Sequence, residues 1–329
     1  LDSEHAVING AMTTIHLAIM TLCHSRVSFA RAYPRETTEM VLDAHVKAFA
    51  YFGGSCDRGI YDNMKTAVIK IHKGKDRDWQ KNFDLMSSHY LFEHNACTPG
   101  EPQEKGIVER SIQTIQEDFF RPSPKVTSLS ELNEQLESEC IKRARSRFHP
   151  EITDKTKWDV FLEEKKSLTI IHREFDAYVD GHGRVSMTQL VQVDRNKYSV
   201  PSEAINKIVD VRIYSDKLVF VFKGEKIAEH NRVFGRDKVI TQFEHYLDAL
   251  DRKPGAIRNG MPFQNINLPT AIVEIRWRMR ENYDDADRQF VEILCAVRDF
   301  GVDDVNCACE LAIEDGLVSK DVVLNILYR

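Results

Sequence analysis

The first apolar segments of the chain alternate with short polar turns, as in a sheet of paired strands. Residues 12–22 and 26–33 are mostly apolar and flank the polar turn at Cys23-His-Ser-Arg26. Asn9-Gly10 is a dipeptide that favours a tight hairpin turn, and we expect a leading strand that ends near Asp2. The pattern therefore predicts an antiparallel start to the fold.

Helical spacing then replaces the strand pattern. Apolar residues recur every three or four positions over residues 37–52, up to the helix-ending Gly53-Gly54. The short apolar segment Ile60-Tyr61-Asp62 is typical of another strand, and residues 68–75 predict a basic hairpin. Further helices are expected over residues 82–92, 104–120 and 130–147, with an extended segment at 93–97 between the first two. This alternation predicts an α/β fold.

The second half of the chain has a different organisation. Arg121-Pro-Ser-Pro124 interrupts the helical pattern, and several short strand signals follow over residues 170–232. The expected strands are 184–193, 197–200, 209–214 and 217–222, with turns at Asp180-Gly181 and Lys223-Gly224. Short, closely spaced strands favour a small barrel. We therefore expect four parts: an α/β core at 1–125, a helical extension and linker at 126–165, a small β-barrel at 166–235 and a helical region at 236–329.

Composition narrows the class of protein. The chain of 329 residues is 42% hydrophobic and 29% charged, and it has no apolar run long enough to span a membrane. Its seven cysteines include no CxxC pair, which favours free thiols in a reducing compartment. The first residue is Leu1, so we expect the natural N-terminus to lie upstream.

The formal net charge of −6 is unevenly distributed along the chain. Residues 284–315 contain ten acidic residues against two arginines, so the rest of the chain is slightly basic. An acidic total is therefore compatible with a local basic surface that contacts nucleic acid. We expect the acidic helices to dock on another protein or to cap the barrel within the same chain.

Three carboxylates stand where strands and helices of this pattern meet. Asp2 lies at the leading strand, Asp62 ends a short strand, and Glu109 lies beside the apolar stripe of the helix at 104–120. Carboxylates that meet at one sheet edge can hold two Mg²⁺ ions, which suits phosphodiester chemistry. The alternatives are a strand cap for Asp62 and a solvated position for Glu109, and Glu4 and Glu36 compete with Asp2 as the first ligand.

Basic residues near these carboxylates are candidates for contacts with DNA phosphates. The candidates are Lys65, Lys70, Lys73, Lys75, Lys105, Arg110, Lys142, Arg143 and Arg145. Each run alone is typical of a solvated face, and Lys105 could simply pair with Glu109 one helical turn away. Asn63 is either an ordinary turn residue or a hydrogen-bonding support for the metal ligands.

These motifs resemble a known pattern of carboxylates. Leu1-Asp-Ser-Glu-His5, Ile60-Tyr-Asp-Asn63 and Lys105-Gly-Ile-Val-Glu-Arg110 are similar to the D, D, E motifs of retroviral-integrase-like enzymes. The closer resemblance is to IstA-type transposases of bacterial insertion sequences. It extends over nearly the whole chain, through Gly59-Ile-Tyr-Asp-Asn63 to Tyr198-Ser-Val-Pro201 in the barrel segment.

The resemblance implies an RNase-H-like integrase catalytic core and a DDE transposase activity, with Asp2, Asp62 and Glu109 as catalytic metal ligands. It implies two Mg²⁺ ions, for which Mn²⁺ can substitute. The implied partners are transposon-end DNA, target DNA, further copies of the chain in a multimer, and an AAA+ helper ATPase, in a bacterial cytoplasm near the nucleoid. Two alternatives stay open: a catalytically silent DNA-binding scaffold of the same fold, and a structure-selective nuclease.

Overall fold

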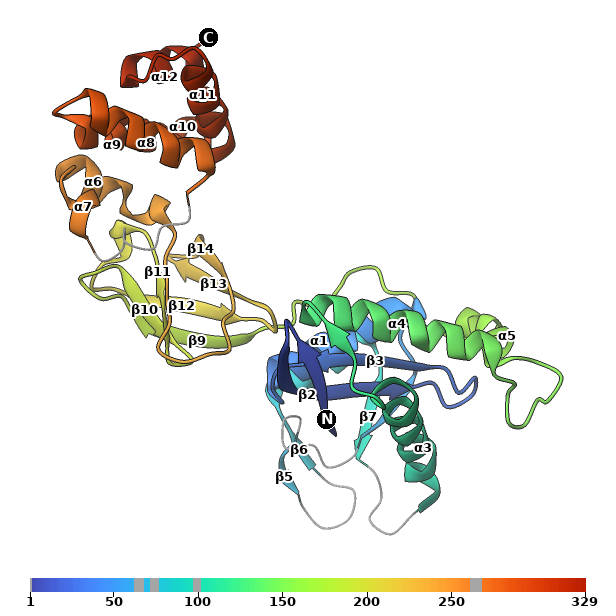
Figure 1. The fold of residues 1–329 in the computed structure, drawn as a ribbon. Coiled ribbons are helices and arrows are strands. Elements are labelled where there is room, and N and C mark those ends of the chain that lie inside the picture. Colours follow the sequence, from blue (N-terminus) through green and yellow to red (C-terminus); the bar gives the residue numbers. More distant parts are fainter. Residues whose placement is uncertain (1, 62–67, 72–76, 97–101, 261–267) are drawn as a thin grey trace. The chain divides into compact units, whose positions relative to one another are not determined.

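The computed structural model describes residues 2–61, 68–71, 77–96, 102–260 and 268–329. The chain divides into two compact units. Unit 1 comprises Leu1–Val179 with Ile213–Asp216, and unit 2 comprises Asp180–Arg212 with Lys217–Arg329. Figure 1 shows the elements of both units.

Unit 1 is built on a four-stranded sheet in the order β3-β2-β1-β8. Its strands are β1 (Asp2–Ile8), β2 (Ala11–Thr21), β3 (Ser28–Tyr33) and β8 (Lys125–Val126). The predicted hairpin at Asn9-Gly10 is confirmed, with left-handed φ values of 48° and 81° that such a turn requires. The leading strand begins at Asp2 rather than ending near it, so Asp2 is paired with Leu17 of β2.

Helices cover both faces of this sheet. Because strand side chains alternate between faces, Leu17, Ala30 and Ala32 pack with α3 (Pro102–Phe119) and α4 (Leu129–Ser146). Phe29 and Leu22 instead pack with α1 (Thr38–Phe52). In Figure 1, α4 runs along the sheet, and its Asn133 pairs with both backbone groups of Ala32 on β3 at 2.7 and 3.1 Å.

The remaining strands of unit 1 form two small ladders. β4 (Arg58–Tyr61) pairs in parallel with β7 (Glu93–Ala96), and α2 (Lys81–Tyr90) precedes β7. β5 (Val68–Ile71) and β6 (Arg77–Trp79) are antiparallel, which confirms the strands of the predicted basic hairpin. Within the described residues, β1 and β4 belong to different hydrogen-bonded sheets, and the meeting of the three carboxylates at one edge stays a prediction. The unit also contains α5 (Lys157–Glu164), whose Phe161 packs beside α1.

Unit 2 begins with strands in two sheets. The sheet β14-β13-β12-β9 is formed by Glu225–Asn231, Lys217–Phe222, Ile208–Ile213 and Val179–Arg184, and β10-β11-β15 is formed by Leu190–Val193, Asn196–Ser199 and Val239–Ile240. The turn predicted at Asp180-Gly181 is wrong, since both residues lie inside β9. The strand predicted at 184–193 is interrupted, because Gln189 adopts a left-handed φ of 61° just before β10. A closed barrel stays a prediction.

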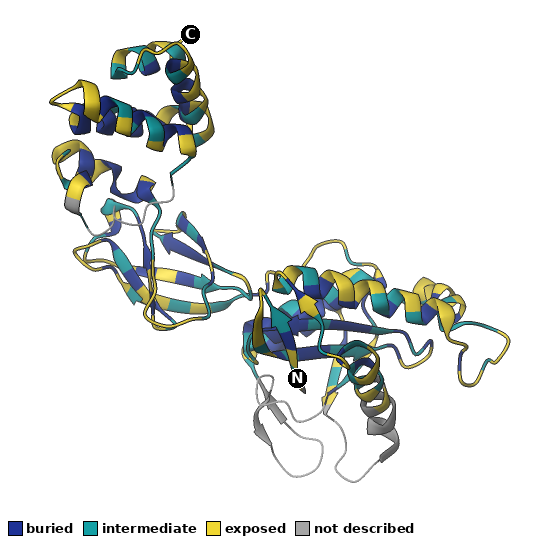
Figure 2. Cartoon of the chain, in the orientation of Figure 1, coloured by how far each residue is buried: buried dark blue, intermediate teal, exposed yellow. Residues whose placement is uncertain are grey.

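The C-terminal part of unit 2 is helical. Its helices are α6 (Leu247–Arg252), α7 (Ala256–Asn259), α8 (Thr270–Asn282), α9 (Ala286–Cys295), α10 (Val297–Phe300), α11 (Val302–Glu314) and α12 (Lys320–Leu327). The apolar stripe of α9, including Phe290 and Leu294, is buried in one cluster with Ile275 of α8 and Val305 of α11. In Figure 2, buried dark-blue segments alternate with exposed yellow ones along the helices of this module. The stripe is therefore used inside the module and is not available for docking through this face, whereas capping of the barrel stays a prediction.

None of the helices in the described ranges combines the length and apolar character needed to cross a bilayer.

Candidate functional site

The carboxyl ends of two parallel strands mark the place where the predicted metal ligands enter the fold. β4 and β7 run in register, with Tyr61 opposite Ala96. Asp62 follows β4 directly, and the segment after β7 leads into α3, which carries Glu109. Functional groups in α/β folds commonly gather beyond the carboxyl ends of parallel strands. This pairing therefore brings the chain segments on either side of the predicted site to one edge.

Tyr61, the last residue of β4, is fixed by a buried histidine. The ring of His45 on α1 donates from Nδ1 to the Val41 carbonyl at 2.7 Å, so its Nε2 accepts from the Tyr61 hydroxyl at 3.1 Å. Phe83, Phe92 and Phe49 surround the His45 ring. Burial lowers the pKa of His45 to about 4, although its hydrogen bond to Val41 opposes the shift. His45 is therefore neutral, and in this form it positions the end of β4, which precedes Asp62.

Acid should weaken unit 1 through His45. The pKa of His45 is about 4 in the folded protein and has the ordinary value of 6.5 in the unfolded chain. As the pH falls, the unfolded chain therefore binds a proton at this histidine before the folded protein does. The contribution of His45 is therefore complete above pH 6.5 and is lost between pH 6.5 and 4, by at most about 1.4 kcal/mol per pH unit. Urea unfolding at about pH 7, 5.5 and 4.5 measures this slope. His45→Phe should flatten it, whereas His5→Gln at an exposed position should not; equal slopes in all three proteins would contradict the assignment.

Asp2 and α3 approach the same part of the first sheet. Leu17, the cross-strand partner of Asp2, is buried in one cluster with Ile115 of α3. Glu109 precedes Ile115 by six residues on this helix, a rise of about 9 Å. The backbone therefore carries Asp2 and Glu109 on elements that pack together, although the side chains of both residues are outside the described set.

The remaining members of the predicted site are not described. Asp62 and Asn63 lie outside the described residues, and no cluster of three or more His, Cys, Asp or Glu side chains forms a metal site within the described ones. The chemistry of the predicted donors still fits the implied ion, because three carboxylates supply the hard oxygen ligands that Mg²⁺ prefers. Asp2, Asp62 and Glu109 are thus the residues that could hold it.

The predicted DNA contacts divide into three groups. Lys65, Lys73 and Lys75 lie outside the described residues, and Lys70 and Lys105 are described only as backbone in β5 and α3. Arg110 on α3 is exposed. On α4, the Lys142 side chain is 76% exposed with Glu139 at 3.4 Å, and the Arg145 guanidinium lies 4.8 Å from the Trp158 ring centroid.

Arg143 has a different environment from its neighbours on α4. Its side chain is only 13% exposed, pairs with Asp118 at 2.8 Å and donates to the Thr114 carbonyl at 3.1 Å. Burial lowers the pKa of Arg143, while Asp118 opposes the shift. The residue joins α4 to α3 inside the unit, which gives it a structural role, and its contact with DNA stays a prediction. The basic sequence at 142–147 does not predict that Arg143 is buried while Lys142 is exposed, because this difference arises from the packing of α4 against α3.

The sequence motifs assign no role to His45. The available signal was its place in the apolar periodicity of residues 37–52, since a histidine on the buried face needs hydrogen-bond partners.

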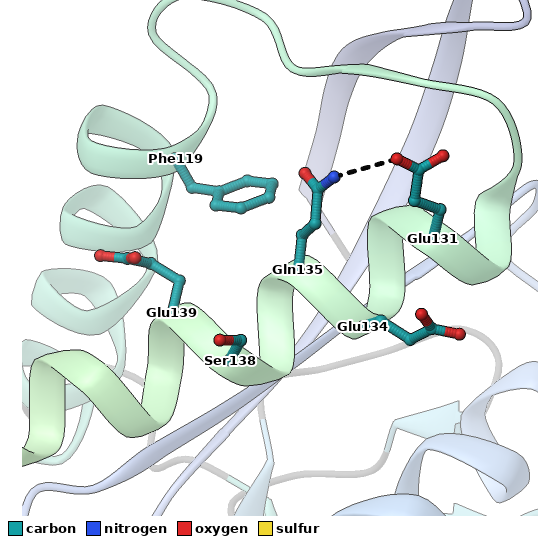
Figure 3. Close-up of a pocket in the computed structure, with 6 residues that line it drawn as sticks. All are labelled: Phe119, Glu131, Glu134, Gln135, Ser138 and Glu139. Atoms are coloured by element: carbon teal, nitrogen blue, oxygen red, sulfur yellow. Dashed lines mark hydrogen bonds between the residues drawn. The ribbon is translucent and has the colours of Figure 1, made fainter.

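A separate hollow lies between α3 and α4. It is lined by Phe119 of α3 and by the α4 residues Glu131, Glu134, Gln135, Ser138 and Glu139. Figure 3 shows Phe119 reaching from α3 toward Gln135, whose amide donates to Glu131 at 3.2 Å. None of these lining residues belongs to the predicted carboxylate set, so the hollow is distinct from the predicted catalytic site.

Comparison with a family model identifies the strand-rich part of unit 2. Residues 171–242 match the model described as Mu transposase, C-terminal domain. The match covers the strands from β9 to β15. It agrees with the family resemblance that the sequence motifs predict for this segment.

Curated relatives extend the similarity to the whole chain. A transposase for insertion sequences IS1326/IS1353 from Pseudomonas aeruginosa is 40% identical over 333 aligned residues, covering 100% of this chain and 65% of that protein. The IS21 transposase from Pseudomonas aeruginosa is 29% identical, over 69% of this chain and 58% of the relative. The chain thus spans slightly less than two thirds of the length of the first of these relatives.

Among solved structures, the HTLV-2 integrase catalytic core domain in complex with magnesium is 15% identical and covers 49% of this chain and 92% of its own, with a TM-score of 0.34. That superposition is too loose to establish a common fold. The full-length sequence identity and the domain match do establish the kinship: the chain belongs to the family of insertion-sequence transposases.

Proposed function

We propose that this chain carries the catalytic core and the C-terminal part of a DNA transposase that cuts at insertion-sequence ends and joins the freed 3′-OH to target DNA. The observation that carries the proposal is the parallel pairing of β4 and β7, which end together where Asp62 and the approach to α3 begin. The kinship with insertion-sequence transposases supports the same reaction.

In this proposal Asp2, Asp62 and Glu109 hold two divalent ions, with Mg²⁺ as the natural ion and Mn²⁺ as a substitute. Bound there, the ions would lower the pKa of the attacking water and stabilise charge on the attacking and leaving oxygens. By holding those ions the carboxylates would orient the scissile phosphodiester for in-line displacement, while Lys105 and Arg110 neutralise phosphate charge beside them. Asn63 supports the ligands by hydrogen bonding.

The two chemical steps use the same groups. In the first, water forms a bond to phosphorus as the bond to the 3′ oxygen breaks, which leaves a 3′-OH on the element. In the second, that 3′-OH attacks a phosphodiester of target DNA and releases the target's own 3′-OH. Each step exchanges one P–O bond for another, so the reaction requires no covalent protein–DNA intermediate and no nucleophilic Ser or Tyr. We further propose that the chain acts as a multimer on DNA with an AAA+ helper ATPase.

A strand-transfer assay tests the proposal. Pre-cleaved transposon ends, a supercoiled target and purified protein should give joined products with Mg²⁺ or Mn²⁺ and none with EDTA. Cleavage without joining would favour a structure-selective nuclease instead. Binding of ends with no chemistry in either metal would favour a silent scaffold.

The basic hairpin should contribute to binding through charge alone. Replacing Lys70, Lys73 and Lys75 together by Gln should weaken binding to all duplexes and lower the slope of log affinity against log salt by about 0.9 for each phosphate that the protein no longer neutralises. Fluorescence anisotropy at several salt concentrations measures this slope.

The exposed face of α4 is tested in the same way by Lys142→Gln combined with Arg145→Gln. Arg143 is left intact in this variant because it joins α4 to α3. Unchanged salt slopes in both the hairpin variant and the α4 variant would identify these residues as solvated faces.

A further inference from the structure

The C-terminal helical module separates its charges along the chain. Residues 252–280 contain six arginines and lysines against one glutamate. Residues 281–329 contain twelve acidic residues against four basic ones. The module that makes the chain acidic thus begins with a strongly basic segment, and most of its arginines lie on α8.

Three of these arginines converge on one buried carboxylate. Asp287 of α9 is only 5% exposed and is in contact with Arg258 of α7. Its Oδ1 accepts from Arg280 at 2.9 Å and lies 3.7 Å from the Arg276 guanidinium. Arg276 also donates to the Ile257 carbonyl at 3.0 Å and packs its guanidinium over the Phe290 ring. The cluster therefore ties α7 and α8 to α9.

The cluster contains three arginines and one carboxylate, so it carries two more positive charges than negative ones. The Nε atom of Arg276 is buried and has no hydrogen-bond partner in the described structure. Burial lowers the pKa of Arg276, and the charges of Arg280 and Arg258 add to that effect. Like charges held together in this way would be stabilised by an external anion. The outer arginines, Arg258 and Arg280, are sufficiently exposed to reach one.

An exposed tryptophan adjoins the cluster. Trp277 on α8 is 64% exposed, and the Arg280 guanidinium lies 6.0 Å from its ring centroid. Trp277 therefore presents a large aromatic surface to water, as Tyr283 and Tyr328 of the same module also do, whereas Phe290 at the centre of the module is completely buried. Aromatic rings beside guanidinium groups are the combination that binds sugar–phosphate chains and unpaired bases.

We propose that Arg258, Arg280 and Trp277 form a DNA-binding surface on the helical module, separate from the catalytic carboxylates. Arg258 and Arg280 contact backbone phosphates. A guanidinium group can donate two parallel hydrogen bonds to phosphate oxygens, and the cluster has a net positive charge. Trp277 packs against a sugar or an unpaired base beside them. Since the acidic helices that follow repel DNA, contact is confined to this basic surface. The inference deepens the proposed transposase function and rests on it for the identity of the anion.

Binding measured without catalysis tests the surface. Full-length protein in EDTA is titrated with fluorescent duplex DNA carrying a short single-stranded end, over a range of salt. Arg258→Gln with Arg280→Gln should weaken binding and lower the salt slope by about 0.9 for each phosphate left without its arginine. Arg298→Gln is the matched control, because Arg298 is a similarly exposed arginine of the same module paired one-to-one with Asp248 at 2.9 Å. It should leave the slope unchanged.

Folding is checked by the melting temperature of each variant. Arg280→Gln alone leaves Asp287 with two arginine partners, so it provides a folded variant if the double variant is unstable. Trp277→Ala should weaken binding to the single-stranded end by about fivefold or more, while Trp277→Phe should retain most of the affinity. Native affinity and slope in folded Arg280→Gln and Trp277→Ala proteins would overturn the proposal.

Light scattering of the same variants distinguishes DNA binding from self-association. If the variants bind DNA normally but change their oligomeric state, the surface contacts a second copy of the chain and the DNA assignment is wrong. Because EDTA removes catalysis from the measurement, failure of the proposed transposase chemistry would leave the binding result unaffected.

Discussion

Asp62→Asn, Glu109→Gln and Asp2→Asn should each abolish DNA cleavage and strand transfer while leaving the fold and DNA binding nearly unchanged. Each substitution keeps the size of the side chain and removes one negative charge from the proposed ion-binding set. Loss of one ion's stabilisation of the transition state is worth several kcal/mol, which corresponds to about a thousandfold or more in rate. Single-turnover assays with pre-cleaved ends measure joining separately from cleavage, and thermal melting confirms that each variant is folded.

The assignment of the first ligand has its own control. Glu4 lies two residues further along β1, on the same side of the strand as Asp2, and Glu36 lies between β3 and α1. Glu4→Gln and Glu36→Gln should both retain activity. A fully active Asp2→Asn protein together with an inactive Glu4→Gln protein would transfer the role to Glu4.

Deleting residues 282–329 should unfold the rest of the C-terminal helical module. The deletion removes most of the buried cluster, including Phe290, Leu294 and Val305, and exposes Ile275 and Met279 of α8 to water. The remaining short helices, α6 and α7, cannot bury that surface by themselves. Calorimetry of the full and truncated chains should show the loss of one cooperative transition, with the transition of unit 1 retained.

A point substitution tests the same core with less disruption. Phe290→Ala should destabilise the module by about 3–5 kcal/mol, because it opens a cavity at a fully buried position. Leu317→Ala, at an exposed position of the same module, should have little effect. A truncated chain that keeps a cooperative transition for residues 243–281 would show instead that α9–α12 are an independent docking element.

The regular elements of unit 1 could be predicted because their signals are local. The hairpin at Asn9-Gly10 and the helix ending at Gly53 depend on glycine in left-handed conformations, which the sequence states directly. Unit 2 was harder to predict. Gly181 and Gly183 lie inside β9, where Gly183 packs its backbone against Val191, so Gly183 serves a close approach rather than a turn.

The candidate site stays a prediction from the motifs, which group Asp2, Asp62 and Glu109 as a carboxylate set. The described backbone adds that Asp2 lies on β1, that Glu109 lies on α3 and that β4 ends just before Asp62. The sequence could not predict that Arg143 is buried and Lys142 is exposed. The two basic residues are adjacent in the sequence, but they lie on different sides of α4.

By itself, the sequence determined the family, the order of the helices and strands from β1 to α3, and the residue types of the proposed catalytic set, since these depend on local propensity and on motifs. The tertiary structure decided which side chains are used inside the fold. It buried His45 against Tyr61, paired Arg143 with Asp118, turned the α9 stripe inward and gathered three arginines around Asp287. The physical reason is that burial and ion pairing depend on contacts between residues far apart in the chain, which a local sequence pattern does not predict.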